Sequence, residues 1–373
     1  MLLGVAFVFL ILLLFAMQMP ETLFMGALLC CLYACRFLGE PNVSSNMLLI
    51  VNFFVLAFLP GIVGMNHGVS TLFYFFSTLA VFFAAKSFCC NTVEYVLGCL
   101  RIVYAIAVCC IFLALYAYWD IPEPLGQVFP GSSTNGIPSY LIVLQAMLSI
   151  TTFFALRRLP LISAGFTVVV AFFGLGRGSL IVSVLILLAS AAINFFFGRV
   201  SKLQRICIFV AFLVCVIAIA FYVDILKSAL VDTTKLQEGL VDPYRMEIFR
   251  QYIAKIDALS FITGASYSGT VVESQYDGNP HISFIRVHSL LGIFGLLFVF
   301  FSPLFIMVAK KKLLDKFVTL LFISLMLLRA LSEPILFPSL LDFFYFSMFF
   351  LFYGYAQGEK SIHSRIGLEK RFA

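Results

Sequence analysis

The chain is 373 residues long, and 62% of its residues are hydrophobic while only 11% are charged. Its mean hydropathy is +1.08, whereas soluble domains carry about 25% charged residues on average. This composition excludes a water-soluble fold of this length. The net charge of +6 does not indicate nucleic-acid binding, because the basic residues lie between hydrophobic segments and form no stripe. We expect an all-α polytopic membrane protein.

Hydrophobic segments recur along the whole chain, and about twelve of them have a length suited to spanning a bilayer as helices. In chain order we predict spans at 1–18, 22–38, 46–65, 70–86, 97–118, 138–156, 160–176, 178–197, 206–226, 282–308, 316–331 and 335–355. Only Arg177 separates the seventh span from the eighth, so these two form a tight hairpin or one broken helix. The first span lacks the basic start and the cleavage site of a signal peptide, so we expect it to stay uncleaved. No internal repeat is visible, which favours a single membrane domain over residues 1–373.

Lysine and arginine alternate between the loops in a regular way. The richer set of loops and the tail contain Arg36, Lys86, Arg157, Arg158, Arg199, Lys202, Arg205, Lys310, Lys311, Lys312, Lys316, Lys360, Arg365, Lys370 and Arg371. Because positively charged loops face the cytoplasm, this alternation predicts a multi-pass protein with both termini in the cytoplasm. The opposite face then holds residues 119–137, Arg177, a long loop at 227–281 and residues 329–333.

The loop at 227–281 is the one long polar segment of the chain. Residues 244–259 within it have helical spacing, with Met246, Phe249, Ile253 and Ile256 on one side. We predict a short amphipathic helix there, which rests on the membrane surface or caps a cavity. The ten cysteines all lie outside this loop, and their spacing is not that of metal ligands. We therefore expect neither a metal nor another cofactor.

Several arginines fall on the less basic face, at or near the ends of spans. They are Arg177, Arg245, Arg250, Arg286 and Arg329. Arginine in or near a bilayer is costly, and its guanidinium group matches the oxygens of phosphate or carboxylate. Converging arginines would form an anion site suited to a lipid-linked diphosphate. Two of them have a simpler interpretation: Arg329 could pair with Glu333 one helical turn later, and Arg250 could pair with Glu247 or lie on a solvated helix face.

Two histidines lie beside these arginines. His281 and His288 are seven residues apart, which places them on one face of a helix that begins at the boundary between loop and membrane. An imidazole at that boundary can act as a general base near neutral pH, although a lone interfacial histidine is more often a polar anchor. His67 and His363 have no such company in the sequence, and we interpret them as structural.

Three segments share a family pattern. The first is Gly176-Arg177-Gly-Ser-Leu-Ile-Val-Ser-Val, which begins a hydrophobic span. The second is Arg245-Met-Glu-Ile-Phe249, followed by Ile253 and Phe261-Ile-Thr-Gly264. The third is Pro280-His-Ile-Ser-Phe-Ile285, followed by Leu291-Gly-Ile-Phe-Gly-Leu-Leu-Phe298. In this order, around one large external loop, they resemble the O-antigen polymerase and O-antigen ligase family of bacterial membrane glycosyltransferases.

The resemblance covers roughly residues 170–300, and the expected topology extends it to the whole chain. The chain departs from the family pattern at two places. Ile282 stands where an asparagine often follows the histidine, and Phe249 stands where a tryptophan is frequent. The first departure leaves the exact role of His281 open.

The resemblance implies a metal-independent enzyme of the GT-C glycosyltransferase fold in the bacterial inner membrane, with its large loop in the periplasm. It implies that Arg177 and Arg245 bind the diphosphate of an undecaprenyl-diphosphate-linked glycan and that His281 activates the acceptor hydroxyl. Our reading of the residues adds Arg250, Arg286, His288 and Arg329 as ligands of the diphosphate or the glycan. The implied partners are the lipid-linked oligosaccharide and polysaccharide, membrane lipids and a chain-length regulator protein, with no nucleic acid.

Three functions fit this pattern to different degrees. We favour an O-antigen polymerase, which transfers a growing glycan onto a lipid-linked repeat unit at the periplasmic face. An O-antigen ligase, which transfers finished glycan to lipid A-core, uses the same donor chemistry. A flippase for lipid-linked sugars is a more distant alternative, because transporters often carry internal repeats and this chain has none.

Overall fold

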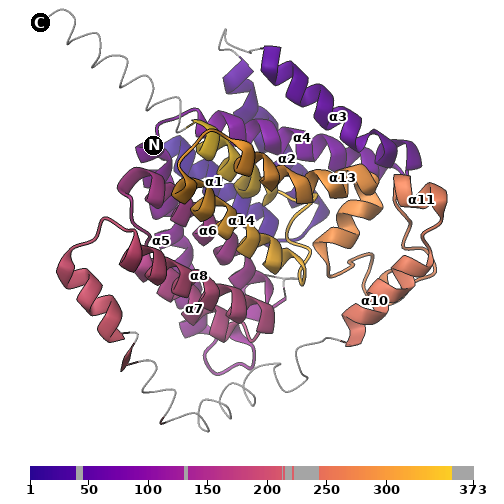
Figure 1. Ribbon diagram of the computed structural model, residues 1–373. Helices are drawn as coiled ribbons and strands as arrows, with labels where there is room; N and C mark the ends of the chain where they lie inside the picture. Colours follow the sequence, from indigo (N-terminus) through magenta and orange to yellow (C-terminus); the bar gives the residue numbers. More distant parts are fainter. Residues whose placement is uncertain (39–44, 130–132, 212, 215–220, 222–242, 355–373) are drawn as a thin grey trace, which may run out of the picture.

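The computed structural model describes residues 1–38, 45–129, 133–211, 213–214, 221 and 243–354, and over these residues the regular structure is entirely helical. Most helices pack into one bundle, and a smaller group formed by residues 243–276, which we call the projecting group, extends from its side (Figure 1). In chain order they are α1 (Leu2–Ala16), α2 (Pro20–Leu38), α3 (Ser45–Gly64), α4 (Val69–Cys89), α5 (Val93–Ala117), the 3-10 helix η1 (Pro124–Gln127), α6 (Gly136–Leu156), α7 (Leu161–Phe173), α8 (Arg177–Phe196), α10 (Pro243–Ala254), α11 (Ala258–Thr263), α12 (Val271–Gln275), α13 (Ser283–Val308) and α14 (Leu313–Ala330). Residues 202–211 and 342–354 are also helical.

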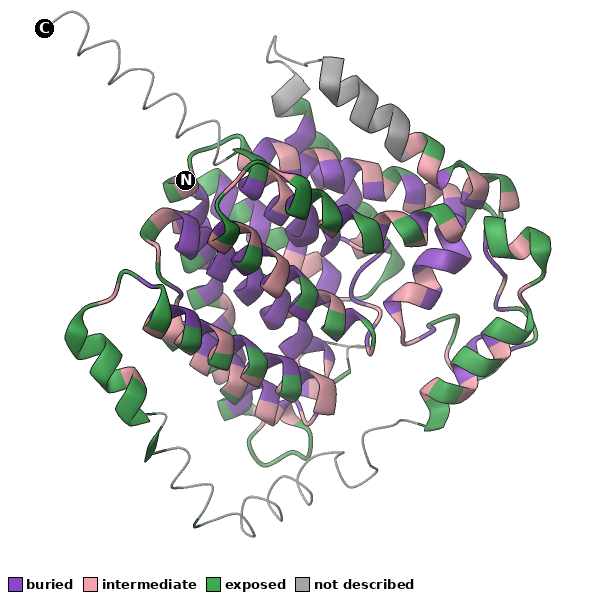
Figure 2. Ribbon diagram, in the orientation of Figure 1, coloured by how far each residue is buried: buried purple, intermediate pink, exposed green. Residues whose placement is uncertain are grey.

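The helices have the length and composition of a membrane protein. Within the described ranges, five are long and apolar enough to cross a bilayer, namely α4, α5, α6, α8 and α13, and α1 and α7 are shorter apolar helices. Large apolar side chains cover much of the outside of the bundle, for example Leu113 and Ile162, and Figure 2 shows exposed residues along the outer helix faces. The protein is therefore helical and membrane-embedded in character. The finer expectation of about twelve spans stays a prediction.

One predicted span differs from what the structure shows. The span at 335–355 is helical only from residue 342, and residues 335–341 form an irregular segment instead. The carboxylate of Asp342 holds this segment, because it accepts the backbone N–H groups of Phe337 and Ser339, both at 2.8 Å. The span at 206–226 lies largely outside the described residues, beyond a helix at 202–211. The tail bases Lys360, Arg365, Lys370 and Arg371 also lie outside them.

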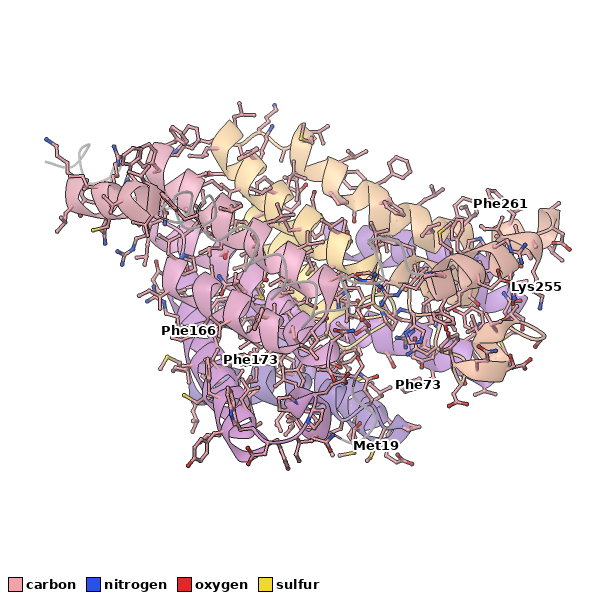
Figure 3. All side chains as sticks on the ribbon, turned by 90° about the horizontal axis from the view of Figure 1, so that it is seen from below. Met19, Phe73, Phe166, Phe173, Lys255 and Phe261 are labelled. Carbon is pink, nitrogen blue, oxygen red and sulfur yellow. The ribbon has the colours of Figure 1, made fainter. Side chains whose placement is uncertain are left out.

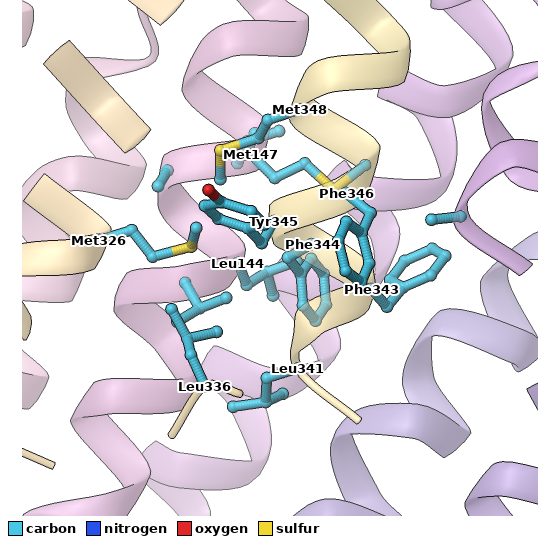
Figure 4. Packing of buried hydrophobic residues seen from close by; sticks show 14 of the residues in the cluster. Leu144, Met147, Met326, Leu336, Leu341, Phe343, Phe344, Tyr345, Phe346 and Met348 are labelled. Atoms are coloured by element: carbon cyan, nitrogen blue, oxygen red, sulfur yellow. The ribbon is translucent and has the colours of Figure 1, made fainter. Parts of the chain in front are cut away.

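The helix at 342–354 lies at the centre of the bundle. Phe343, Phe344 and Tyr345 are fully buried and pack among residues from α6 and α14, including Met147 and Met326 (Figure 4). The hydroxyl of Tyr345 is the polar group among these three side chains. It has a hydrogen-bond partner, because it donates to the backbone carbonyl of Val299 at 2.8 Å. A core of this kind fixes the positions of the surrounding helix ends.

Ion pairs distinguish the two ends of the bundle. At one end, which we call the Asp315 end, Arg157 at the end of α6 pairs with Asp315 in the first turn of α14. Lys311 also lies there, 4.1 Å from the ring centre of Phe352. The other end, which we call the Arg329 end, holds Arg329 in the last turn of α14. Arg157 and Lys311, which belong to the predicted cytoplasmic loops, therefore lie at the Asp315 end. Arg329, which belongs to the predicted opposite face, lies at the other end.

The predicted amphipathic helix at 244–259 is two shorter helices. α10 ends at Ala254, and α11 starts after Asp257, whose carboxylate and backbone form a capping box with Ser260. Figure 3 shows Lys255 and Phe261 of this projecting group at the far side of the molecule from Phe166 and Phe173 of α7.

The inward face of α10 is not the expected one. Ile248 and Tyr252 are buried against residues such as Ala265 and Val272, whereas Met246, Phe249 and Ile253 are exposed. The predicted apolar side therefore points away from the protein. An exposed apolar side on a short surface helix suits contact with lipid.

A break in α13 receives the projecting group. Gly292 has φ 71° and ψ −173° inside this helix, a conformation essentially restricted to glycine, and a Cβ there would collide with the carbonyl oxygen of Ile262. Asn66, between α3 and α4, donates to the carbonyl oxygens of Thr263 at 3.0 Å and Ser289 at 3.3 Å. The broken helix and the α3–α4 turn therefore hold the end of α11 against the bundle.

Candidate functional site

A shared carboxylate lies at the centre of the Arg329 end. The Nη2 of Arg329 is 3.2 Å from Oε1 of Glu333, and the Nη2 of Arg245 in α10 is 3.6 Å from the same oxygen. The pairing of Arg329 with Glu333 that the sequence suggested is therefore present, but it includes a second arginine from the projecting group. One carboxylate thus contacts two guanidinium groups that come from separate parts of the chain.

Arg329 is deeply buried for a charged side chain. It is 2% exposed, and its Nη1 donates to the Ser332 hydroxyl at 2.6 Å. Its Nε has no hydrogen-bond partner in the part of the chain that the structure describes. Burying a cation is costly unless counter-charges and hydrogen bonds compensate, so this position favours an anion nearby.

The first turn of α8 lies against this arginine. Helix N-termini present backbone N–H groups without an intrahelical partner, and the N-cap residue Gly176 supplies no side-chain hydrogen bond. A Cβ on Gly178 would lie 2.7 Å from Ser332 Oγ and 3.2 Å from Arg329 Nη1, so any larger residue would require one of these side chains to shift. Arg177, the first residue of α8, is half-buried. A helix N-terminus beside arginines is a favourable place for a phosphate.

Arg286 joins the same region from α13. Its Nη1 donates to the carbonyl oxygen of Pro334 at 3.2 Å, and its guanidinium lies 5.1 Å from the ring centre of Tyr74. The Ser283 hydroxyl in the same helix donates to the carbonyl oxygen of Glu333 at 2.7 Å. Ser283 and Arg286 of α13 therefore contact two consecutive residues, Glu333 and Pro334, of the segment that follows α14.

His288 has a different environment from the one that the sequence predicted. Its Nε2 lies 3.0 Å from the carbonyl oxygen of Phe261, an acceptor, so Nε2 carries the proton. Its Nδ1 then accepts from the Tyr252 hydroxyl at 2.7 Å, and that oxygen accepts from the backbone N–H of Ala265 at 3.3 Å. Both ring nitrogens of His288 thus bind the projecting group to α13. This geometry gives the side chain a structural role, and binding of a diphosphate or glycan by His288 stays a prediction.

His281 lies at the start of α13, on the side of the projecting group. Its backbone has φ 53°, its N–H donates to Asn279 Oδ1 at 3.0 Å, and its ring packs edge-on against Tyr276 with 4.8 Å between ring centres. The side chain is half-buried. Ser283, two residues later, contacts the backbone of Glu333, so His281 and the shared carboxylate lie near the same end of α13.

Arg250 is turned away from the shared carboxylate. Its side chain is 78% exposed, compared with 29% for Arg245, and it makes two hydrogen bonds of 3.0 Å to the Glu247 carboxylate. These bonds from Arg250 lower the pKa of Glu247 below its usual value. The local pair suggested by the sequence describes this geometry, and such exposed pairs contribute little to stability.

The structure also reveals a histidine that sequence reasoning set aside. His67, in the α3–α4 turn, lies with its Nε2 2.6 Å from the Ser289 hydroxyl, and its ring packs against Tyr267 at 4.9 Å. Burial, and secondarily the charge of Arg286, lower the pKa of His67. Its neighbours follow more than 190 residues later in the chain, so no local pattern could have indicated them.

The structure thus brings Arg177, Arg245, Arg286 and Arg329 to one end of the bundle and leaves Arg250 and His288 with other partners. In the described ranges, no group of three or more histidine, cysteine, aspartate or glutamate residues is placed to hold a metal ion. The arrangement can hold an anion between cations from three helices and the uncapped start of α8. No family model, no curated protein and no solved structure matches this chain.

Proposed function

We propose that the protein is an O-antigen polymerase, a metal-independent glycosyltransferase that moves a growing glycan from undecaprenyl diphosphate onto a lipid-linked repeat unit. The observation that supports this most is the sharing of Glu333 by Arg245 and Arg329 beside the uncapped start of α8. Two guanidinium groups and a helix N-terminus match the charge and the oxygens of a diphosphate.

The proposed reaction needs few groups. An acceptor hydroxyl loses its proton to a base, and its oxygen attacks the anomeric carbon of the donor sugar. The bond from that carbon to the diphosphate oxygen breaks, and the diphosphate leaves with the electron pair. Arginines oriented before the reaction can stabilise that developing charge in place of a metal. His281 is the base in this proposal, because the family resemblance assigns it that role.

The proposal includes the finer architecture as well. It comprises about twelve spans in a GT-C fold of the inner membrane, both termini in the cytoplasm and the Arg329 end in the periplasm. Two observations support it. Lys311 and Arg157 lie at the opposite end, as positive loops on the cytoplasmic side would. The exposed apolar side of α10, with Met246 and Phe249, suits the surface of the outer leaflet.

The first experiment is a lipopolysaccharide gel of the deletion strain in its native host, together with extraction of its lipid-linked glycans. Polymerase function predicts core capped by a single repeat unit, with no ladder, because ligation continues while chain growth stops. Bare core with long glycan on the lipid carrier would instead show a ligase. Accumulation of the lipid-linked repeat unit on the cytoplasmic side would show a flippase.

A further inference from the structure

A cavity lies next to Glu333, the carboxylate shared by Arg245 and Arg329, and the proposed transfer does not use it. It has a volume of about 750 Å³ and lies where the α1–α2 junction, the first turn of α4 and residues 277–280 meet α13. Binding sites for small molecules usually measure about 300–1,000 Å³. Its polar lining includes Gln18, His67, Asp277, Asn279 and Arg286, and its aromatic lining includes Tyr74.

The hydrogen bonds of Ser289 determine which nitrogen of His67 carries a proton. The Ser289 hydroxyl has one hydrogen, and it donates this to the carbonyl oxygen of Ala265 at 2.5 Å. Ser289 must therefore accept from His67 Nε2, which lies 2.6 Å away. Nδ1 of the neutral ring is then a hydrogen-bond acceptor, and it has no partner among the described residues.

Arg286 provides hydrogen-bond donors in the same cavity. A guanidinium group has five N–H donors, and the one hydrogen bond that Arg286 makes to described residues uses its Nη1. Tyr74 lies under this guanidinium and adds an aromatic surface. The cavity therefore combines an acceptor, donors and aromatic faces within one space.

We propose that this cavity binds a sugar ring of the lipid-linked glycan; this assignment rests on the proposed transferase function. A sugar ring has hydroxyl groups around its rim, which need both donors and acceptors, and C–H faces that pack on aromatic rings. The position fits as well, because Arg286 holds Pro334, the residue after Glu333. A sugar in the cavity would therefore lie next to a diphosphate held by Arg245 and Arg329.

Other occupants fit less well. The carboxylate of Asp277 lines the cavity, and it would repel a diphosphate there. A lipid tail would leave Nδ1 of His67 and the remaining guanidinium donors of Arg286 without hydrogen-bond partners, and polar groups removed from water are costly when unpaired. The aromatic and polar lining together favour a carbohydrate.

Binding of a soluble glycan to the full-length protein in lipid nanodiscs tests this directly. The probe is the repeat-unit oligosaccharide released by mild acid from the host's own lipid-linked pool, and the measurement is its Kd by calorimetry. His67→Gln keeps a donor where Nε2 lies but removes the Nδ1 acceptor, whereas His67→Asn does the reverse. We expect Kd to rise roughly 3- to 10-fold in His67→Gln and to stay near the wild-type value in His67→Asn, as loss of one hydrogen bond implies.

Two further variants separate this proposal from the transferase proposal. Tyr74→Ala should weaken glycan binding, because it removes an aromatic wall. Arg245→Ala should abolish transfer while leaving the Kd of the soluble glycan unchanged, because that side chain binds the diphosphate. Unchanged Kd in both His67→Gln and Tyr74→Ala, or no binding by folded wild-type protein, would overturn the sugar site. Wild-type protein that binds the glycan but transfers none when given lipid-linked donor and acceptor would overturn the transferase function and leave the sugar site standing.

Truncated oligosaccharides show which substrate contributes the sugar. If removal of the sugar at the reducing end abolishes binding, the cavity holds the donor sugar next to the diphosphate. If removal of the sugar at the non-reducing end abolishes binding, it holds the acceptor. Equal loss of affinity with either truncation, or no loss with either, would contradict recognition of a particular ring.

Discussion

The two ends of α14 hold the same kinds of side chain in different arrangements. At the Asp315 end, Asp315 pairs with Arg157, and their side chains are 6% and 18% exposed. At the Arg329 end, one carboxylate, Glu333, contacts both Arg329 and Arg245. The first pair ties α6 to α14, whereas the carboxylate of Glu333 joins α10 to the end of α14 through two guanidinium groups.

This difference separates a structural pair from a candidate ligand site. Arg157 and Asp315 join two neighbouring helices of the bundle. Arg245 comes from the projecting group, and the glycine at 178 brings the start of a third helix against Arg329. Several cations from separate helices can bind one anion together. An ion pair that only stabilises two helices does not need several cations.

The strongest test of the comparison uses two arginines of the same helix. Arg245→Ala should lower turnover roughly 100-fold or more, because removal of one preorganised charge-stabilising group has such effects. Arg250→Ala, which removes an exposed side chain paired with Glu247, should change turnover less than about twofold. Product formation by membranes with equal amounts of each variant measures both. Equal loss in the two variants would contradict the special position of Arg245.

His281→Ala separates proton removal from diphosphate binding. Loss of a general base costs about 100-fold or more in turnover, while affinity for the lipid-linked donor should stay near the wild-type value. Single-turnover assays and donor binding on the same purified variant measure the two quantities. A variant with full turnover would show that another group, or no protein group, takes the proton.

Gly178→Ala tests the contact between α8 and Arg329 without changing a charge. The added methyl group would displace Ser332 Oγ or Arg329 Nη1, and misplacement of a charged group by a fraction of an ångström should lower turnover roughly tenfold. Gly165→Ala in α7 is the matched control, because a Cβ there meets no atom within 4 Å. If the two variants had equal activity at equal expression, the close approach would be irrelevant to function.

Arg157→Ala should have the smallest effect on turnover and a clear effect on stability. It leaves the buried Asp315 without its partner, and breaking a buried ion pair costs about 3 kcal/mol. Thermal unfolding in detergent should therefore occur at lower temperature, while turnover per folded molecule stays within about twofold, as expected for a residue far from the reacting groups. Arg158→Ala, an exposed neighbour, should leave both unchanged. A large loss of turnover in folded Arg157→Ala would remove the distinction between the two ends.

Hydrophobicity predicted most helices because a spanning helix needs a long apolar run, which a sequence displays directly. It failed at residues 335–341, where apolar residues form an irregular segment held by the Asp342 carboxylate. A single buried acid determines that local structure, and hydropathy does not detect it. Within α10, periodicity indicated an apolar side, but Ile248 and Tyr252 face inward because they meet Ala265 and Val272.

The candidate site was predictable only in part. The arginines were recognisable because they are rare on the less basic face. Their partners were not, because Glu333 meets Arg245 across 88 residues of sequence and His67 meets Ser289 across 222. The roles of His67 and His288 depend on which neighbour each ring nitrogen meets. Only the folded chain determines those contacts.

The most direct test of the diphosphate site is the fate of the lipid-linked repeat unit in the deletion strain complemented with Arg245→Ala or Arg177→Ala. Both variants should insert at normal levels, make no polymer and accumulate the undecaprenyl-diphosphate-linked repeat unit on the outer side of the membrane. Normal polymer in both variants, at normal expression, would contradict a diphosphate site at the Arg329 end.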